Sequence, residues 1–271
     1  MKSGIQGVIC DWAGTTVDFG SLSPVAAFAE AFDRFGFSVS FEEIRTFMGM
    51  LKFDHTQAIL ELTKERFSEQ FGRFPDEKDA RAIYAYFEPA LFDVLASHSV
   101  PIKGAVAFAE TLKKRSIKLG STTGYTASMM DVVTREAAKH GYKPDCYVSP
   151  SAYLPGRPHP FMIYKNAIEL EIYPLSSIVK IGDTLSDIRE GLNAGCWSIG
   201  VALSGNETGI SHDAYEHLPK SVLDEKRRQA KEKLENAGAH YVIDGIWDAL
   251  EVLERIEEKI KNGEKPCRIH A

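Results

Sequence analysis

Val8-Ile9-Cys10-Asp11-Trp12-Ala13-Gly14-Thr15-Thr16, near the start of the chain, contains the residues that indicate the fold. The apolar run from Ile5 to Cys10 predicts a buried strand, and the Gly-Thr-Thr that follows Ala13 predicts a sharp turn of the backbone. An aspartate at the carboxyl end of the first strand of an α/β sheet lies where such folds bind their ligands. We therefore expect Asp11 to belong to a functional site.

Beyond about residue 99 the sequence alternates between apolar strands and helices. The expected strands are residues 117–121, 146–148, 178–182, 197–202 and an edge strand at 241–243, and the expected helices are residues 126–140, 161–170, 184–194 and 247–261. Strands that are apolar on both faces and alternate with helices are typical of a mostly parallel sheet. The sequence therefore predicts an α/β fold with a Rossmann-like core.

Residues 20–98 break this alternation. They contain no convincing strand, and their apolar residues recur at helical spacing, as at Phe28, Phe32 and Phe35. We predict an all-helical insert with hinges near residues 19–21 and 97–101. Residues 1–19 and 99–271 would then form the Rossmann-like catalytic core and residues 20–98 a helical domain. The three phenylalanines are equally compatible with a surface for a partner and with the core of the insert.

Composition narrows the class of protein. The chain has 271 residues and a net charge of −6, which argues against a nucleic-acid or anionic-membrane partner, since both favour a basic surface. Its four cysteines are scattered without a metal-binding pattern, and we expect reduced thiols. No apolar signal region and no apolar run long enough to span a bilayer are present, so we expect a cytoplasmic enzyme.

Three later segments place polar groups at predicted strand ends. Thr123 and Gly124 precede a helix, where a hydroxyl and free backbone N–H groups can bind phosphate; an ordinary helix cap is the alternative. Arg157 lies in a loop and can clamp a phosphate with two hydrogen bonds, although such an arginine is more often solvated. Asp183 and Asp187 are spaced as paired carboxylates, which suit Mg²⁺ but also suit a helix N-terminus.

Together with Asp11, these segments resemble in order and spacing the four motifs of the haloacid dehalogenase-like superfamily. Its phosphatases use the first aspartate of a D-x-D-G-T motif as nucleophile and the second as general acid and base. The resemblance implies a helical cap domain inserted after the nucleophile loop. It also assigns site residues: Asp11 as nucleophile, Thr123, Gly124 and Arg157 as phosphate ligands, Asp11, Asp183 and the carbonyl of Ala13 as Mg²⁺ ligands, and Asp187 as their support.

Ala13 stands where those phosphatases have the second aspartate, so a departing alkoxide would find no acid there. Lys52, in the segment Met48-Gly49-Met50-Leu51-Lys52-Phe53-Asp54-His55, lies among apolar residues and shares a helical face with His55. A surface lysine on an amphipathic helix is the alternative interpretation. A lysine held neutral by apolar surroundings, however, condenses with carbonyls. An imine two atoms from phosphorus would act as an electron sink, and its enamine leaving group needs no proton from residue 13.

The combination of Ala13 with Lys52 resembles the phosphonatase family within that superfamily. The resemblance implies Mg²⁺-dependent hydrolysis of phosphonoacetaldehyde to acetaldehyde and phosphate, in 2-aminoethylphosphonate degradation. The steps would be a Schiff base at Lys52 and an aspartyl-phosphate at Asp11, with Met48, His55 and Tyr125 in support. A homodimer formed through the helical domain is also implied. Either His55 or the Lys52 amine is a candidate base for the hydrolytic water.

Three other functions deserve comparison. A phosphate-ester phosphatase is disfavoured because loss of the acid at residue 13 typically costs a factor of ~10²–10⁴ in rate. A dehalogenase proper needs no metal, and the groups at Thr123, Arg157 and Asp183 argue against it. A catalytically dead binding protein would be expected to lose the other motifs, which are all present. Trp12 and Tyr125 are compatible with both a pocket wall and ordinary packing.

Overall fold

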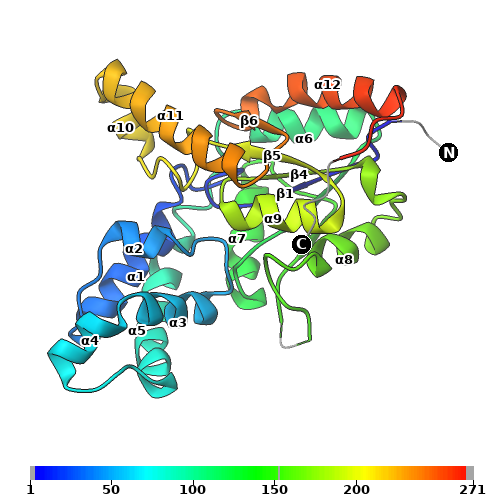
Figure 1. Cartoon of the computed structure of the whole chain (residues 1–271). Helices are drawn as coiled ribbons and strands as arrows, with labels where there is room; N and C mark the ends of the chain where they lie inside the picture. The colour runs from blue at the N-terminus through cyan, green and yellow to red at the C-terminus, as the bar shows by residue number, and fades with distance from the viewer. Residues whose placement is uncertain (1–3, 152, 267–271) are drawn as a thin grey trace.

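The computed structural model describes residues 4–151 and 153–266 and contains one parallel sheet of six strands in the order β3-β2-β1-β4-β5-β6 (Figure 1). The strands are β1 (Gly7–Cys10), β2 (Lys118–Thr122), β3 (Cys146–Val148), β4 (Ile178–Gly182), β5 (Trp197–Val201) and β6 (Tyr241–Ile243). All five pairs of neighbouring strands run parallel. The predicted α/β class with a Rossmann-like sheet is confirmed.

Helices cover both faces of this sheet. They are α6 (Ala105–Lys114), α7 (Ala127–Lys139), α8 (Phe161–Glu169), α9 (Leu185–Ala194), α10 (His212–His217), α11 (Lys220–Asn236) and α12 (Ala249–Lys261). Val8 and Cys10 pack in one apolar cluster with residues of α6 and α12, whereas Ile9 packs with residues of α8. Successive strand residues point to opposite faces, which explains why every residue of β1 is buried. Figure 1 shows α6 and α12 on one side of the sheet and α8 and α9 on the other.

The strand order determines where polar groups can gather. Strands β2 and β3 lie on one side of β1, and β4, β5 and β6 lie on the other. The chain therefore reverses its direction of winding at β1. In open parallel sheets, ligands bind beyond the carboxyl ends of the strands at such a point. The ends of β1, β2 and β4 are neighbours here, so residues that follow these three strands meet.

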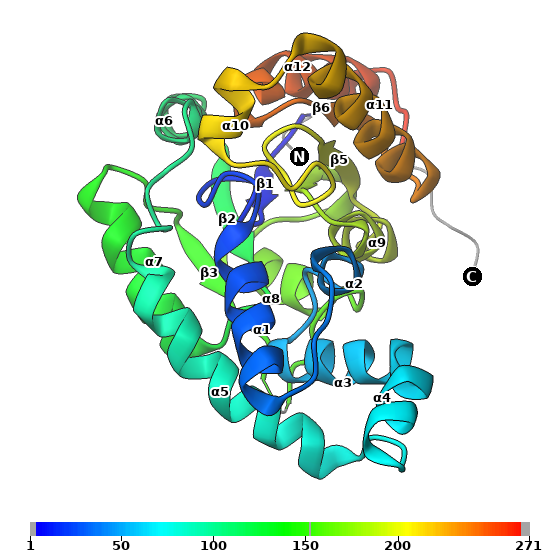
Figure 2. The ribbon, with the colours of Figure 1, turned by 90° about the vertical axis from the view of Figure 1, so that its left-hand side faces the viewer.

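A helical insert connects β1 to β2. It consists of α1 (Leu22–Phe35), α2 (Phe41–Arg45), α3 (Lys52–Leu62), α4 (Lys64–Phe71) and α5 (Glu77–Leu95), and no strand occurs among these described residues, as predicted. Figures 1 and 2 show the five helices gathered together beside the core. Phe28 and Phe32 are fully buried, and the rings of Phe28 and Phe87 stack at 4.0 Å. These phenylalanines therefore form the core of the insert and not a surface for a partner.

Three of the four cysteines lie among the described residues. Cys10, Cys146 and Cys196 are free and lie in or next to strands, while Cys267 lies outside the described residues. Within residues 4–151 and 153–266, every helix is too short or too polar to cross a bilayer.

Candidate active site

Asp11 follows β1 and is 6% exposed. The next residues turn sharply: Gly14 has a φ of 81°, and a Cβ atom at this position would lie 2.0 Å from Oδ2 of Asp183. The hydroxyl of Thr16 donates to the carbonyl of Asp11 at 2.9 Å and fixes the turn. Glycine is thus required both for the backbone conformation and for the close approach of Asp183 to this loop.

Three carboxylates form a possible metal site. Single oxygens of Asp11, Asp183 and Asp187 all lie within 4.8 Å of one another. Burial and the neighbouring Asp11 and Asp187 raise the pKa of Asp183 well above its usual range. Asp183 accepts a hydrogen bond from the amide of Asn206 at 2.8 Å, but it has no ion pair to a described lysine or arginine. A buried carboxylate without a cationic partner, close to two further carboxylates, fits a hard divalent cation.

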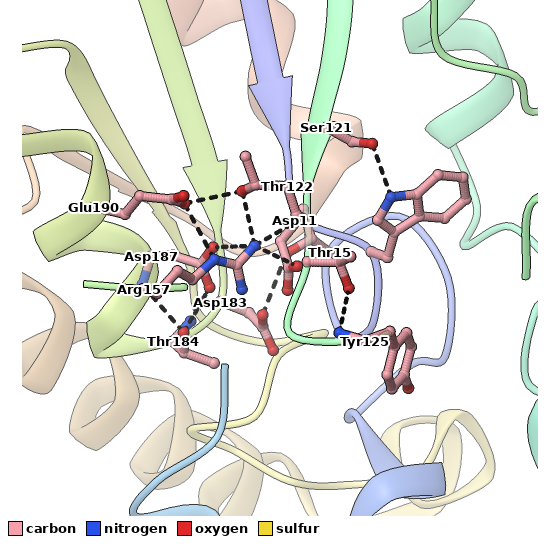
Figure 3. A network of polar contacts seen from close by, with 12 residues as sticks. Asp11, Thr15, Ser121, Thr122, Tyr125, Arg157, Asp183, Thr184, Asp187 and Glu190 are labelled. Carbon is pink, nitrogen blue, oxygen red and sulfur yellow. Dashed lines mark hydrogen bonds and ion pairs between the residues drawn. The ribbon is translucent and has the colours of Figure 1, made fainter. Parts of the chain in front are cut away.

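Arg157 contacts Asp11 directly. Its Nη2 lies 2.7 Å from Oδ1 of Asp11, and its Nε donates to Glu190 at 3.1 Å (Figure 3). Burial lowers the pKa of Arg157, but Asp11, Asp187 and Glu190 outweigh it and raise the value. Nη1 has no hydrogen bond to any residue that the structure describes, which leaves it available to an anion. The interpretation of Arg157 as a solvated surface arginine is wrong, since it is 4% exposed.

Three residues that the sequence did not single out complete this network: Thr122, Lys180 and Glu190. The hydroxyl of Thr122 accepts from Lys180 at 2.8 Å and from Arg157 at 2.9 Å, and it donates to Glu190 at 2.9 Å. The Thr122 hydroxyl has one hydrogen to donate and two lone pairs to accept with, and all three are used. Lys180 also pairs with Asp187 at 2.7 Å. A lysine within the apolar strand β4 was the sequence signal that could have identified this network.

Charge balance in the buried network again favours a divalent cation. The four carboxylates of Asp11, Asp183, Asp187 and Glu190 face the two cations Arg157 and Lys180. Two negative charges are left over, which one divalent cation would neutralise. Buried ions are stable only when they are paired, so a cation lowers the cost of keeping all four carboxylates ionised. Asp187 already has two cationic partners, whereas Asp183 has none among the described residues.

Lys52 begins α3 of the insert and faces the core. It is 3% exposed, and its Nζ lies 5.2 Å from the centre of the Tyr125 ring. Burial lowers the pKa of Lys52 to about 8, although the nearby Asp11 opposes the shift. The alternative of an exposed surface lysine is therefore wrong. The lowered pKa increases the fraction of Lys52 amines that are neutral near neutral pH and able to act as nucleophiles.

One small cavity of about 20 Å³ joins the two parts of the chain. Among the residues that line it are Asp11, Ala13, Thr123, Gly124, Tyr125 and Arg157 from the core and Met48, Gly49 and Lys52 from the insert. Asp183 and Asp187 lie beside Asp11. The structure thus brings together every predicted site residue except His55.

His55 is fully buried and has a different role from the one that the sequence suggested. Its Nε2 donates to the carbonyl of Ile44 at 2.7 Å, and its ring packs 4.3 Å from that of Phe28. Burial and the charge of Lys52 lower the pKa of His55 well below its usual value. The ring is not among the described groups that line the cavity. Sequence spacing placed His55 on the face of Lys52, but its imidazole packs inside the insert.

The structure distinguishes between the alternative interpretations of Trp12, Tyr125 and Thr123. Trp12 is fully buried and donates to the hydroxyl of Ser121 at 2.8 Å, so it is a packing residue. Tyr125 lines the cavity. Helix α7 is capped by Thr126, whose hydroxyl accepts from the amide of Met129. Thr123 is therefore not the cap of that helix and faces the cavity instead.

Comparison with known proteins agrees with this geometry. Residues 8–201 match the model of the haloacid dehalogenase-like hydrolases. The chain is 44% identical to a phosphonoacetaldehyde hydrolase of Bacillus cereus (strain AH820) over 94% of its own length and 97% of that protein. It is 44% identical to one of Syntrophobacter fumaroxidans over 97% of its own length and 95% of that protein. A crystal structure of a phosphonoacetaldehyde hydrolase-like protein from Oleispira antarctica superposes with a TM-score of 0.93 at 37% identity, covering 97% of each chain.

Proposed function

Since the chain belongs to the haloacid dehalogenase-like hydrolase family, we propose that it hydrolyses phosphonoacetaldehyde to acetaldehyde and phosphate. The observation that carries this proposal is the meeting of Lys52, Ala13 and Asp11 in one cavity. A phosphatase acting on esters would need an acid where Ala13 stands. An imine-forming lysine makes that acid unnecessary, because the leaving group is then a neutral enamine. The similarity to curated phosphonoacetaldehyde hydrolases supports the same substrate.

The first half of the reaction uses Lys52 and Asp11. The neutral amine of Lys52 adds to the aldehyde carbon, and loss of one water with uptake of one proton from solvent gives a protonated imine. A carboxylate oxygen of Asp11 then attacks phosphorus, the carbon–phosphorus bond breaks, and its electron pair moves into the imine to give an enamine. The phosphoryl group is left on Asp11 as an aspartyl-phosphate. Nη1 of Arg157 and the residues Thr123 and Gly124 would hold the phosphonyl oxygens.

The second half returns the enzyme to its starting state. The enamine takes a proton on carbon to become an imine, and one water hydrolyses this imine to acetaldehyde and free Lys52. A second water hydrolyses the aspartyl-phosphate. The amine of Lys52 lines the cavity, whereas His55 uses Nε2 to hold Ile44 and has a strongly lowered pKa. These contacts favour Lys52 over His55 as the base for that water.

We propose Mg²⁺ as the cofactor, held by Asp11, Asp183 and the backbone carbonyl of Ala13. The unpaired charge of Asp183 beside Asp11 supports a divalent ion, and oxygen ligands alone suit magnesium. When bound, the ion would offset the repulsion between the carboxylate of Asp11 and the anionic phosphonyl group. Asp187, neutralised by Lys180 and Arg157, would support this arrangement without being a ligand.

Replacement of Asp183 by alanine is expected to remove most of the hydrolytic activity and weaken Mg²⁺ binding, because the one carboxylate of the site without a cationic partner among the described residues is lost. The Schiff base at Lys52 should still form, since that step uses only the insert lysine and the aldehyde. Isothermal titration with Mg²⁺ and a phosphate-release assay measure the two effects. Full activity of Asp183→Ala in the presence of EDTA would contradict the assignment.

Borohydride trapping tests the proposed function. The enzyme incubated with phosphonoacetaldehyde and borohydride should be inactivated irreversibly, with the reduced adduct on Lys52 in peptide maps. Because only the neutral amine attacks, the rate of imine formation should rise about tenfold per pH unit below pH 8 and level off above it. A rate independent of pH between 6 and 8, or an adduct spread over other lysines, would argue against Lys52 as the electron sink.

The homodimer through the helical insert also remains a proposal. The insert carries large apolar side chains on its surface, namely Phe41, Leu62, Phe71, Phe74 and Tyr86, each at least 39% exposed. Burying such groups against a second copy would stabilise a dimer. The cytoplasmic location and the division into two domains at residues 19 and 98 likewise stay predictions.

A further inference from the structure

We propose that Arg45 is a positioning residue, which fixes Lys52 over the nucleophile by holding the insert against the core loop that contacts Asp183. This inference rests on the proposed function, because it concerns how Lys52 reaches Asp11. Arg45 ends α2, seven residues before Lys52, and is half-buried.

The guanidinium of Arg45 contacts one residue of the hinge and two residues of the core. Nη1 donates to the carbonyl of Gly20 at 3.0 Å and to Oδ1 of Asn206 at 3.0 Å, and Nη2 donates to the carbonyl of Gly209 at 3.3 Å. Gly209 has a φ of 59°, and a Cβ there would lie 2.6 Å from the guanidinium carbon. The loop is therefore shaped to admit this side chain. Gly20 belongs to the hinge, so one arginine joins insert, hinge and core.

Asn206 connects Arg45 to the proposed metal site. It is 1% exposed, and its backbone amide donates to Oδ2 of Asp183 at 2.8 Å. Its side-chain amide donates back to the carbonyl of Arg45 at 3.2 Å while its Oδ1 accepts from the guanidinium. The same residue thus orients a carboxylate of the core and pairs reciprocally with the insert. Displacing Arg45 would remove both side-chain bonds of this pair and release the loop that carries the amide.

Within the insert, the anchored end of α2 is tied to the helix of Lys52. The carbonyl of Ile44, next to Arg45, accepts from Nε2 of His55 in α3. A second contact with the core follows, since the hydroxyl of Ser186 donates to the carbonyl of Met48 at 3.0 Å. The chain that leads to Lys52 is therefore held against the core at Arg45 and again at Met48. This arrangement gives the buried His55 a function: it transmits the position of α2 to α3.

Accessibility of Lys52 provides a test that needs neither substrate nor metal. In Arg45→Met, Lys52 should spend more time exposed, and its acetylation by an N-hydroxysuccinimide ester at pH 8 should be about tenfold faster by peptide mapping. Arg34→Met is the matched control, because Arg34 pairs with Glu30 on the exposed surface of α1. Its Lys52 should react at the parent rate. A folded Arg45→Met with the parent rate would overturn the proposal.

The link through Asn206 is tested by a double-mutant cycle. Asn206→Ala keeps the backbone amide that binds Asp183 but removes the pair with Arg45, so it should speed acetylation of Lys52 several-fold. The rate increase in the double variant should be smaller than the product of the two single increases, because each single substitution already removes the bond between Nη1 of Arg45 and Oδ1 of Asn206. Both variants should bind Mg²⁺ more weakly by calorimetry. Purely additive effects, with parent Mg²⁺ affinity, would contradict the coupling. If Arg45→Met does not fold, Arg45→Lys replaces it in the same cycle.

These outcomes are separable from those for the proposed function. Acetylation reports only how often Lys52 is exposed, whereas borohydride trapping reports whether it forms an imine. A parent enzyme that is not trapped by phosphonoacetaldehyde but shows the Arg45 effect would refute the substrate and leave the positioning role intact. A parent enzyme that is trapped by phosphonoacetaldehyde but shows no Arg45 effect would refute the positioning role and leave the proposed substrate intact.

Discussion

Lys52→Arg is expected to abolish cleavage of phosphonoacetaldehyde, with a loss of turnover on the order of 10⁴–10⁶-fold, as for removal of other nucleophiles. Arginine keeps the positive charge but stays protonated and cannot form the imine. Without the imine, the electron pair of the carbon–phosphorus bond would have to become a carbanion. A positive charge near the phosphonyl group is therefore not sufficient for cleavage, which needs a neutral amine at residue 52.

The readouts for Lys52→Arg separate chemistry from electrostatics. Phosphate release and borohydride trapping should both disappear, while inorganic phosphate should still bind in a calorimetric titration, because Arg157 and Thr123 are unchanged. Lys180→Arg is unsuitable as a control because Lys180 is enclosed by Asp187 and Glu190. Lys64→Arg, at an exposed ion pair of the insert, is the matched control and should keep parent activity. Substantial turnover by Lys52→Arg would refute the Schiff-base mechanism.

Asp11→Asn is expected to lose activity by a factor of at least about 10⁴, because a carboxamide of the same shape is a poor nucleophile. Imine formation precedes attack on phosphorus, so trapping of Lys52 by borohydride should persist. The variant would thus accumulate the imine without releasing phosphate. Mass spectrometry of the reduced protein and a phosphate assay on the same sample measure both halves of the reaction.

A suitable control for Asp11→Asn is Asp213→Asn, at an exposed position on α10 beside His217. It should retain parent activity. Loss of trapping together with phosphate release in a folded Asp11→Asn would show that Asp11 is required before the imine forms. Parent rates of phosphate release in that variant would remove Asp11 from the role of nucleophile.

The sequence identified residues that follow strands, because a strand end can be recognised locally. Asp11 comes directly after an apolar run, Thr123 and Asp183 each follow a predicted strand, and parallel strands place their carboxyl ends together. Lys180 and Glu190 were missed because their significance depends on pairing. Lys180 lies in register beside Ile9, and only the turn from β4 into α9 brings Glu190 to the same hydroxyl of Thr122.

The contacts between the insert and the core could not be predicted from any local pattern in the sequence. Arg45 and Asn206 are 161 residues apart, and neither belongs to a periodic pattern. His55 illustrates a different limit. Its spacing from Lys52 correctly placed both on neighbouring positions of α3, but one helix can border the cavity and the core of the insert at once. Which of the two a side chain enters depends on Phe28 and Ile44, which come from other helices.

The helical insert between β1 and β2 separates the two chemistries of the proposed reaction into two blocks of sequence. Handling of phosphorus belongs to the core, whereas capture of the aldehyde belongs to residues 48–55 of the insert. An ancestor that already possessed the first could therefore acquire the second by changes in a contiguous stretch of its gene. A single further change in the core, the loss of the acid at residue 13, would then have carried no penalty. In such a protein a change of substrate class would require substitutions mainly in the insert.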